Sequence, residues 1–178
     1  RLYDSAEAIL AEDKMADVMI IATQDAQHRD HAIAALRKGY DLLLEKPVAP
    51  TAEDCEIIAK RAEEKGVKAL VCHVLRYTPF YMTLKKLIDE GAVGQVTAIN
   101  QIENVGYWHQ AHSFVRGNWR TVRETSPMLL QKSCHDMDII LWLMGRDCKR
   151  VQSFGSLRHF TADNAPQGAP ARCLDGCP

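Results

Sequence analysis

The sequence lacks a charge imbalance, a long hydrophobic run and a signal-like beginning. Lysine and arginine total 22 and aspartate and glutamate total 23, which gives a formal net charge of -1. No overall field therefore attracts nucleic acid or an anionic membrane surface. No apolar run approaches the roughly 18 residues that a membrane span needs, and no basic-then-apolar segment follows Arg1. These absences predict a cytoplasmic protein without nucleic-acid or membrane partners.

Cysteine is present but gives no disulfide pattern. The six cysteines are Cys55, Cys72, Cys134, Cys148, Cys173 and Cys177. The first four lie inside or beside apolar segments, where a reduced thiol behaves as a small hydrophobic group, so no disulfide framework is expected. The last two lie in a polar tail, where a metal or redox pair and a plain loop both stay open. Two thiols are half of a zinc site, so no metal site is predicted.

The first half of the chain alternates strands and helices, and the 47% apolar content is ample for a core. Short apolar runs at 17–22, 41–44 and 68–73 indicate buried strands. Apolar stripes predict helices over 27–38 and 51–65, and a further helix is expected over 4–13. This order is typical of a parallel sheet with crossover helices.

The second half has a different pattern. Residues 79–90 and 127–144 are predicted to be helices, each followed by a glycine, and 95–105 and 150–157 to be strands. These elements are too few for an independent sheet with both faces protected. We therefore predict an α/β protein in which part of a Rossmann-type parallel sheet (residues 1–74) precedes an incomplete α+β domain (residues 75–178).

Polar residues follow the first two predicted strands. Residues 23–28, Thr-Gln-Asp-Ala-Gln-His, come after the first, and Glu45-Lys46-Pro47 after the second. In open parallel sheets, ligands bind outside the carboxyl ends of the strands. Lys46 can donate a proton or hydrogen-bond a hydroxyl there, with Glu45 holding its ammonium in place. The alternative is a solvated Glu–Lys pair before a loop.

Several motifs in order resemble one family. They are residues 22–28, 34–36, 39 and 45–47, followed by 76–79, 91–94, 117–120 and 130–145. Together they resemble the glucose–fructose oxidoreductase / inositol dehydrogenase (Gfo/Idh/MocA) family over roughly residues 1–157. The resemblance implies an N-terminal Rossmann domain and a C-terminal domain with a large, mainly antiparallel sheet. It also implies NAD or NADP as cofactor, and alcohol–ketone interconversion on sugars or polyols.

The resemblance assigns roles to the strand-end residues. Lys46 becomes a catalytic residue that reaches the reacting hydroxyl. The residues implied to bind the cofactor are Thr23, His28, Glu45, Pro47 and Arg76.

A helix in the second half carries the other implied catalytic residue, His135. The family commonly has an Asp four residues before this His, but Gln131 stands at that position here. Gln can hydrogen-bond a sugar hydroxyl but cannot exchange protons, so Gln131 is a predicted substrate-binding residue. His135 or Lys46 would then handle the hydroxyl proton, with Asp138 orienting the imidazole. The alternative for His135 is a hydrogen-bonded core histidine.

Two further features leave alternatives open. Lys132 either forms an exposed pair with Asp136, four residues on, or replaces the missing acid. The second feature is an aromatic and basic cluster at 108–120, which suits carbohydrate recognition and equally a subunit interface. From it we predict Trp119 and Arg120 as substrate-binding residues. The resemblance also implies a homo-oligomer, because the broad sheet of the family often forms dimers or tetramers.

No Gly-x-Gly-x-x-Gly sequence is present, although the family begins with a strand and such a phosphate-binding turn. We therefore expect a chain truncated at both ends that binds a dinucleotide poorly by itself. A sugar or polyol dehydrogenase is the leading hypothesis. The others are a protein that uses NAD for epimerisation or redox-assisted glycoside cleavage, and a non-catalytic dimerisation or regulatory module.

Overall fold

The computed structural model describes residues 1–176, with the exception of the Cys173 side chain. The chain divides into two compact units, Arg1–Asp147 and Cys148–Pro178, which are described separately. The role of Cys173 and Cys177 as a thiol pair lies outside the described residues. Cys55, Cys72, Cys134 and Cys148 are free thiols.

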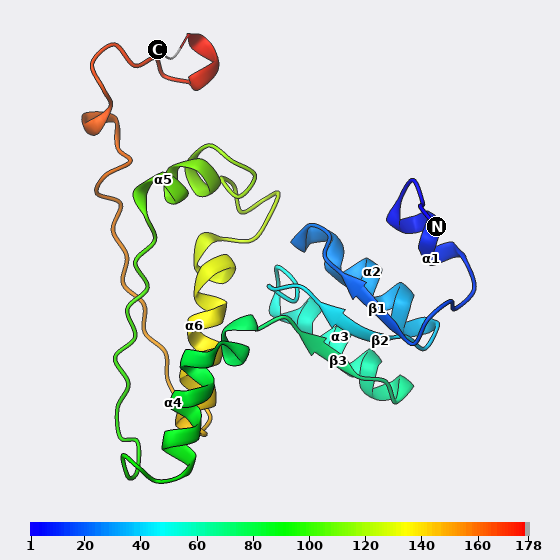
Figure 1. The fold of residues 1–178 in the computed structure, drawn as a ribbon. Helices are drawn as coiled ribbons and strands as arrows, with labels where there is room; N and C mark the ends of the chain where they lie inside the picture. Colours follow the sequence, from blue (N-terminus) through cyan, green and yellow to red (C-terminus); the bar gives the residue numbers. More distant parts are fainter. Residues whose placement is uncertain (177–178) are drawn as a thin grey trace. The chain divides into compact units, whose positions relative to one another are not determined.

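Three parallel strands form the sheet of the first unit (Figure 1). They are β1 (Val18–Ile21), β2 (Asp41–Leu44) and β3 (Ala69–Val71), in the order β1-β2-β3. The register pairs Ile21 with Leu44, and Leu44 with Val71. The three apolar runs therefore form the predicted parallel sheet, and their carboxyl ends lie side by side at one edge.

Three helices accompany this sheet: α1 (Ala6–Ala11), α2 (Asp25–Arg37) and α3 (Ala52–Lys65). Helix α2 begins two residues before its predicted start, which places Asp25 in its first turn. The ends of α3 are as predicted, because the Thr51 hydroxyl caps its first turn and Gly66 ends it in the left-handed conformation, with φ 63°.

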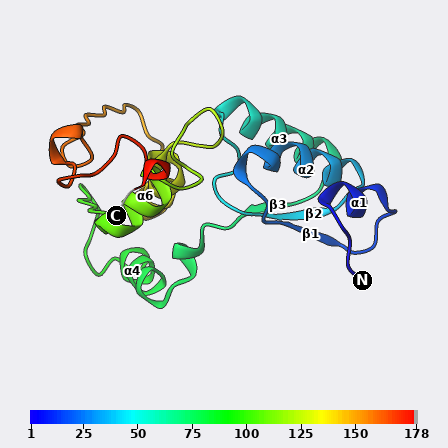
Figure 2. The same ribbon diagram turned by 90° about the horizontal axis from the view of Figure 1, so that it is seen from above.

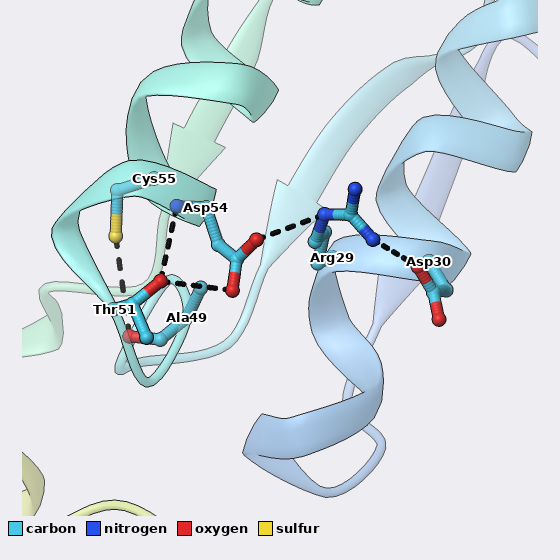
Figure 3. Close-up of polar contacts among 6 residues, drawn as sticks. All are labelled: Arg29, Asp30, Ala49, Thr51, Asp54 and Cys55. Atoms are coloured by element: carbon cyan, nitrogen blue, oxygen red, sulfur yellow. Dashed lines mark hydrogen bonds and ion pairs between the residues drawn. The ribbon is translucent and has the colours of Figure 1, made fainter.

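Helices α2 and α3 cover the same face of the sheet (Figure 2). Ile21, Leu42 and Leu44 pack there against Leu36 and Ile58, and all five side chains are at most 4% exposed. The two helices are also joined by charge, since Arg29 Nε lies 2.8 Å from Asp54 Oδ1 (Figure 3). This layer is the main hydrophobic core of the described residues.

The opposite face of the sheet carries exposed apolar side chains. Val18, Ile20 and Leu70 are 50%, 66% and 59% exposed. Parallel sheets normally bury both faces. This face therefore has the composition of a buried surface, but no element of the first unit, residues 1–147, covers it.

The second half of the first unit is helical. It contains the 3₁₀ helix η1 (Val74–Tyr77), α4 (Pro79–Asp89), the short helix α5 (Tyr107–His109) continued by the π-helical η2 (Gln110–Val115), and α6 (Met128–Met144). The two long helices confirm the predictions for 79–90 and 127–144. The second unit contains only the short 3₁₀ helices η3 (Ala162–Asn164) and η4 (Cys173–Asp175) in its described part.

The two strands predicted for the second half are wrong. Residues 95–105 and 150–157 have no regular secondary structure, and the antiparallel sheet implied for this region has no strand among residues 1–176. A strand exists through backbone hydrogen bonds to a neighbour, and too few strands do not make a stable sheet. The apolar side chains of 150–157 also find no core, since Val151, Phe154 and Leu157 are 71–92% exposed.

Within residues 1–176, no helix has both the length and the apolar character required to cross a membrane. The same residues contain no group of three or more His, Cys, Asp or Glu side chains arranged to hold a metal ion.

Candidate functional site

Two strand-end loops meet at the carboxyl edge of the sheet, and His28 holds them together. The Glu45 N–H donates to Ile21 O at 2.9 Å, so the β1–β2 pairing continues past the last strand residue. The His28 ring is 1% exposed, with Nδ1 2.9 Å from Pro47 O and Nε2 3.0 Å from Thr23 O. Both ring nitrogens are thus engaged by backbone carbonyls. His28 therefore holds the two loops together, and its own binding of a cofactor stays a prediction.

The Thr23 hydroxyl faces helix α2. Its Oγ1 lies 3.0 Å from Nδ1 of His31, whose Nε2 is 3.6 Å from Glu7 Oε1. Thr23 is exposed, and its hydroxyl contacts His31 on helix α2.

Lys46 extends from the second loop toward helix α6. Its ammonium Nζ donates to the backbone carbonyl of Gln131 at 3.1 Å. The Glu45 carboxylate instead accepts from the Lys46 backbone N–H at 3.0 Å, so the prediction that Glu45 holds the ammonium is wrong. The Glu45 side chain is shorter than that of Lys46, so its carboxylate bonds to the adjacent backbone amide and not to the ammonium. The Lys46–Pro47 peptide bond is cis, which the sequence left undecided.

His135 lies on the same face of α6 as Gln131, one turn further along. Its ring and that of His73 are 5.8 Å apart at 81°, and the buried Nδ1 of each has no hydrogen-bond partner within residues 1–176. Burial lowers the pKa of His135 below its usual value, and the positive charge of Lys46 and the neighbouring His73 lower it further. The imidazole is therefore neutral near pH 7 and can accept a proton.

Asp138 does not orient this imidazole, contrary to prediction. Its carboxylate accepts two hydrogen bonds from Arg76, at 2.7 and 2.6 Å, because a guanidinium presents two parallel donors that match a carboxylate. This pairing raises the pKa of Arg76, and the guanidinium also lies 5.5 Å from the Trp142 ring centre. Arg76, a predicted cofactor ligand, thereby fixes α6 to η1.

A buried network anchors the start of α6 to the first turn of α2. Oδ2 of Asp25 accepts from the Ser126 backbone N–H at 3.0 Å, from the Ser126 hydroxyl, and from Gln131 Nε2 at 2.8 Å. All three residues are at most 7% exposed. The Gln131 side-chain nitrogen thus donates to a buried carboxylate of the protein itself. The Gln131 backbone carbonyl accepts a hydrogen bond from Lys46 Nζ.

The sequence reasoning missed Asp25 and Ser126 as residues that shape the site. A signal was available for Asp25, which sits inside the strand-end motif and in the first turn of a helix, where a carboxylate is favoured. Nothing local to Ser126 indicates a partner 101 positions earlier in the chain.

Lys132 is half-buried and does not form the expected surface pair with Asp136. Asp136 is 5% exposed and its Oδ1 accepts from Gln101 Nε2 at 3.0 Å, so that prediction is wrong. Burial lowers the pKa of Lys132, as does the charge of Lys46, and Glu103 opposes this shift. Lys132 directly follows Gln131, whose carbonyl accepts from Lys46 Nζ, so both lysines lie at the same turn of α6.

Trp119 and Arg120 make local contacts. The Trp119 ring lies 6.4 Å from that of Phe114, and Arg120 bonds to Gly117 O at 3.2 Å and pairs with Glu124 at 3.6 Å. Gly117 allows the tight turn here, because an added Cβ would lie 2.3 Å from the carbonyl oxygen of His112. These contacts do not reach Lys46 or His135, and substrate binding by Trp119 and Arg120 stays a prediction.

The described residues fit the nicotinamide end of a dinucleotide site. Two strand-end loops are joined by a buried histidine, and a lysine and a neutral histidine lie beside them. Binding of the nicotinamide and its ribose by Thr23, Glu45 and Pro47 stays a prediction. The turn between β1 and α2, residues 22–24, contains no glycine, so the described residues include no phosphate-cradling turn. A parallel sheet with polar loops at this edge is the arrangement in which Rossmann-fold oxidoreductases bind NAD.

Comparison with known proteins agrees with this class. Residues 1–73 match the family model described as "Oxidoreductase family, NAD-binding Rossmann fold". Residues 81–169 match "GFO/IDH/MocA C-terminal domain". The chain therefore belongs to the Gfo/Idh/MocA family of NAD-binding oxidoreductases. This confirms the family that the sequence motifs predicted and a nicotinamide dinucleotide as its cofactor.

Individual relatives are similar over most of this chain. Inositol 2-dehydrogenase of Salmonella typhimurium is 33% identical over 149 residues, covering 82% of this chain and 40% of that protein. The putative oxidoreductase YteT of Bacillus subtilis is 27% identical over 148 residues, covering 83% and 34%. The WlbA dehydrogenase of Bordetella pertussis, solved with NADH and UDP-GlcNAcA, has a TM-score of 0.65 at 26% identity, covering 80% and 41%. The chain spans well under half the length of these relatives.

Proposed function

We propose that this chain forms part of an NAD(P)-dependent dehydrogenase that interconverts an alcohol and a ketone on a sugar, polyol or related hydroxy compound. The observation that carries the proposal is the hydrogen bond from Lys46 Nζ to Gln131 O, 3.1 Å long. It links the strand-end loop to the helix that carries His135, across 85 positions of sequence.

The chain's own residues divide the proton chemistry between them. Lys46 donates a hydrogen bond to the substrate hydroxyl and stabilises developing negative charge on its oxygen. The neutral imidazole of His135 receives the hydroxyl proton and returns it in the reverse reaction. The nicotinamide cofactor, when bound, supplies hydride acceptance and donation at the carbinol carbon.

The names of relatives support a carbohydrate-like substrate. One relative is an inositol 2-dehydrogenase, and WlbA was solved with a nucleotide sugar. From these we infer a sugar or polyol for this chain, without preference between NAD and NADP. A homo-oligomer and a cytoplasmic location stay predictions from the sequence.

A second candidate is use of bound NAD for epimerisation or redox-assisted glycoside cleavage. It is favoured by Gln131, which stands one helical turn before His135 and whose amide is committed to Asp25 and Ser126. No side-chain acid at that position shares the proton work with His135. Product analysis separates this candidate from simple oxidation, since epimerisation leaves the redox state of the substrate unchanged.

The test is a titration of the protein expressed from its complete reading frame with NADH and NADPH, followed by assays on a panel of sugars and polyols. We expect cofactor binding below millimolar concentration, and a drop in kcat of about 100-fold or more in Lys46→Met with NADH binding retained. Lys60→Met, an exposed lysine on α3, is the matched control and should keep full activity. Failure of the wild-type protein to bind millimolar cofactor would contradict both enzyme proposals and favour the non-catalytic module.

A further inference from the structure

We propose that the substrate of this site carries an anionic group, a carboxylate or a phosphate ester, and that Lys132 is the residue that selects it. The inference rests on the proposed function and deepens it, since it names the chemical class of the sugar or polyol. Its basis is the distribution of paired and unpaired charges around the first turns of α6.

Three carboxylates on or against this part of α6 have partners of their own, although the buried Oδ2 of Asp136 has none within residues 1–176. Asp25 accepts from Ser126 and Gln131. Asp136 accepts from Gln101 at 3.0 Å. Asp138 is bound in bidentate fashion by Arg76. These carboxylates point to partners of their own.

The two lysines of the site have no such pairing. Lys46 donates to a backbone carbonyl, which is a neutral acceptor. Among residues 1–176, no carboxylate lies within ion-pair distance of either Lys46 or Lys132, although both side chains are partly buried. Glu103 is the one carboxylate that influences Lys132 from a greater distance, and it is exposed.

Two neighbouring cations in a partly buried site are unfavourable in the absence of an anion. Burial and the charge of Lys46 together lower the pKa of Lys132, and the charge of Lys46 also lowers that of His135. A bound anionic group would relieve this repulsion, because charge attraction strengthens as water is excluded.

The position of Lys132 on α6 would bring such an anion close to a substrate bound by Lys46 and His135. Lys132 directly follows Gln131, whose carbonyl holds Lys46 Nζ. His135 comes three residues later, so the side chains of Lys132 and His135 lie on adjacent sides of the helix. A substrate held between Lys46 and His135 by its hydroxyl would meet the Lys132 ammonium through a neighbouring substituent.

The inference is tested with matched probes, with saturating NADH in the binding titrations and saturating NAD⁺ as the oxidant in the turnover assays. D-glucose, D-glucuronate and D-glucose 6-phosphate share one ring configuration and differ in charge, and the galacto series repeats the comparison. We expect one anionic member to bind at least about tenfold more tightly than its neutral hexose, the strength of one hydrogen bond to a charged group. The carboxylate and phosphate arms show which anion the site takes.

Variants at position 132 assign the preference. Lys132→Met should raise Kd and KM for the anionic probe by about tenfold with little change for the neutral hexose, while Lys132→Arg should keep the preference. Lys60→Met is again the control.

A wild-type protein that binds NADH and oxidises neutral hexoses as well as anionic ones would overturn the inference and leave the proposed function intact. A loss of kcat without any change in anion preference would instead assign Lys132 to proton transfer, and would also overturn it.

Discussion

Asp25 is the residue whose environment most constrains the site. One of its carboxylate oxygens receives three donors from Ser126 and Gln131, and each of these residues is buried. A buried donor that loses its acceptor costs about 1–3 kcal/mol. The carboxylate therefore holds the start of α6 in the position from which the Gln131 carbonyl meets Lys46.

Replacement of Asp25 by Ala should lower the free energy of unfolding by about 2–4 kcal/mol, because the buried Ser126 donors lose their acceptor and Gln131 Nε2 keeps only Ser126 Oγ. Chemical denaturation monitored by tryptophan fluorescence measures this loss. Asp30→Ala on the same helix removes an exposed carboxylate that pairs with Arg29 and should change stability by less than about 1 kcal/mol. Equal effects of the two variants would contradict the anchoring role.

The same variant should also alter the acid response. Burial raises the pKa of Asp25, but hydrogen bonds from Ser126 and Gln131 outweigh it and bring the pKa below 3.8. A carboxyl with a depressed folded-state pKa contributes stability above its unfolded pKa, and this stability is lost as pH falls through the folded value. The wild-type protein should thus lose stability below about pH 4 more steeply than Asp25→Ala.

At the scale of elements, the start of α3 shows how one side chain joins two helices (Figure 3). The Thr51 hydroxyl accepts from the Asp54 N–H at 3.1 Å and donates to Asp54 Oδ2 at 2.9 Å. The other carboxylate oxygen of Asp54 pairs with Arg29 on α2 at 2.8 Å. The cap therefore also holds the carboxylate that faces α2.

Thr51→Ala should lower the free energy of unfolding by about 1 kcal/mol, the usual worth of an N-cap hydroxyl. Thr51→Ser keeps the hydroxyl and should restore most of that stability. Thermal unfolding followed by circular dichroism gives the comparison. A Ser variant as unstable as the Ala variant would show that the methyl group, and not the cap, stabilises this turn.

Element prediction succeeded where the signal was local. The limits of α3 follow from Thr51 at one end and Gly66 at the other, and α6 ends at Gly145 with φ 61°. The predicted strands at 95–105 and 150–157 failed because a strand depends on a partner that its own sequence does not specify. Alternating polarity alone does not supply one.

At the scale of the whole sheet, the two faces differ sharply in burial. Ile20 and Ile21 are consecutive residues of β1 that point to opposite faces. Ile21 is 4% exposed under α2 and α3, whereas Ile20 is 66% exposed. The pair therefore compares one residue type in both environments.

Ile21→Ala should lower the free energy of unfolding of the 178-residue chain by about 2–5 kcal/mol, since it removes buried methyl groups and leaves a cavity. Ile20→Ala should cost less than about 1 kcal/mol in the same chain. Urea unfolding of both variants measures the difference. A large loss for Ile20→Ala would show that a second layer covers its face in solution.

The sequence by itself determined the parallel β-α-β order, the helix ends and the strand-end position of Lys46, because periodicity, caps and turn residues act over a few positions. It also placed His135 on the same helix face as Gln131. Only the tertiary structure decided which partners the polar groups take. Lys46 bonds to the Gln131 carbonyl across 85 positions, and Asp25 bonds to Ser126 across 101. Asp138 accepts from Arg76 and not from His135. Such pairings depend on which donor and acceptor the packing of α2, η1 and α6 brings within 3 Å or so, and no local pattern encodes that distance.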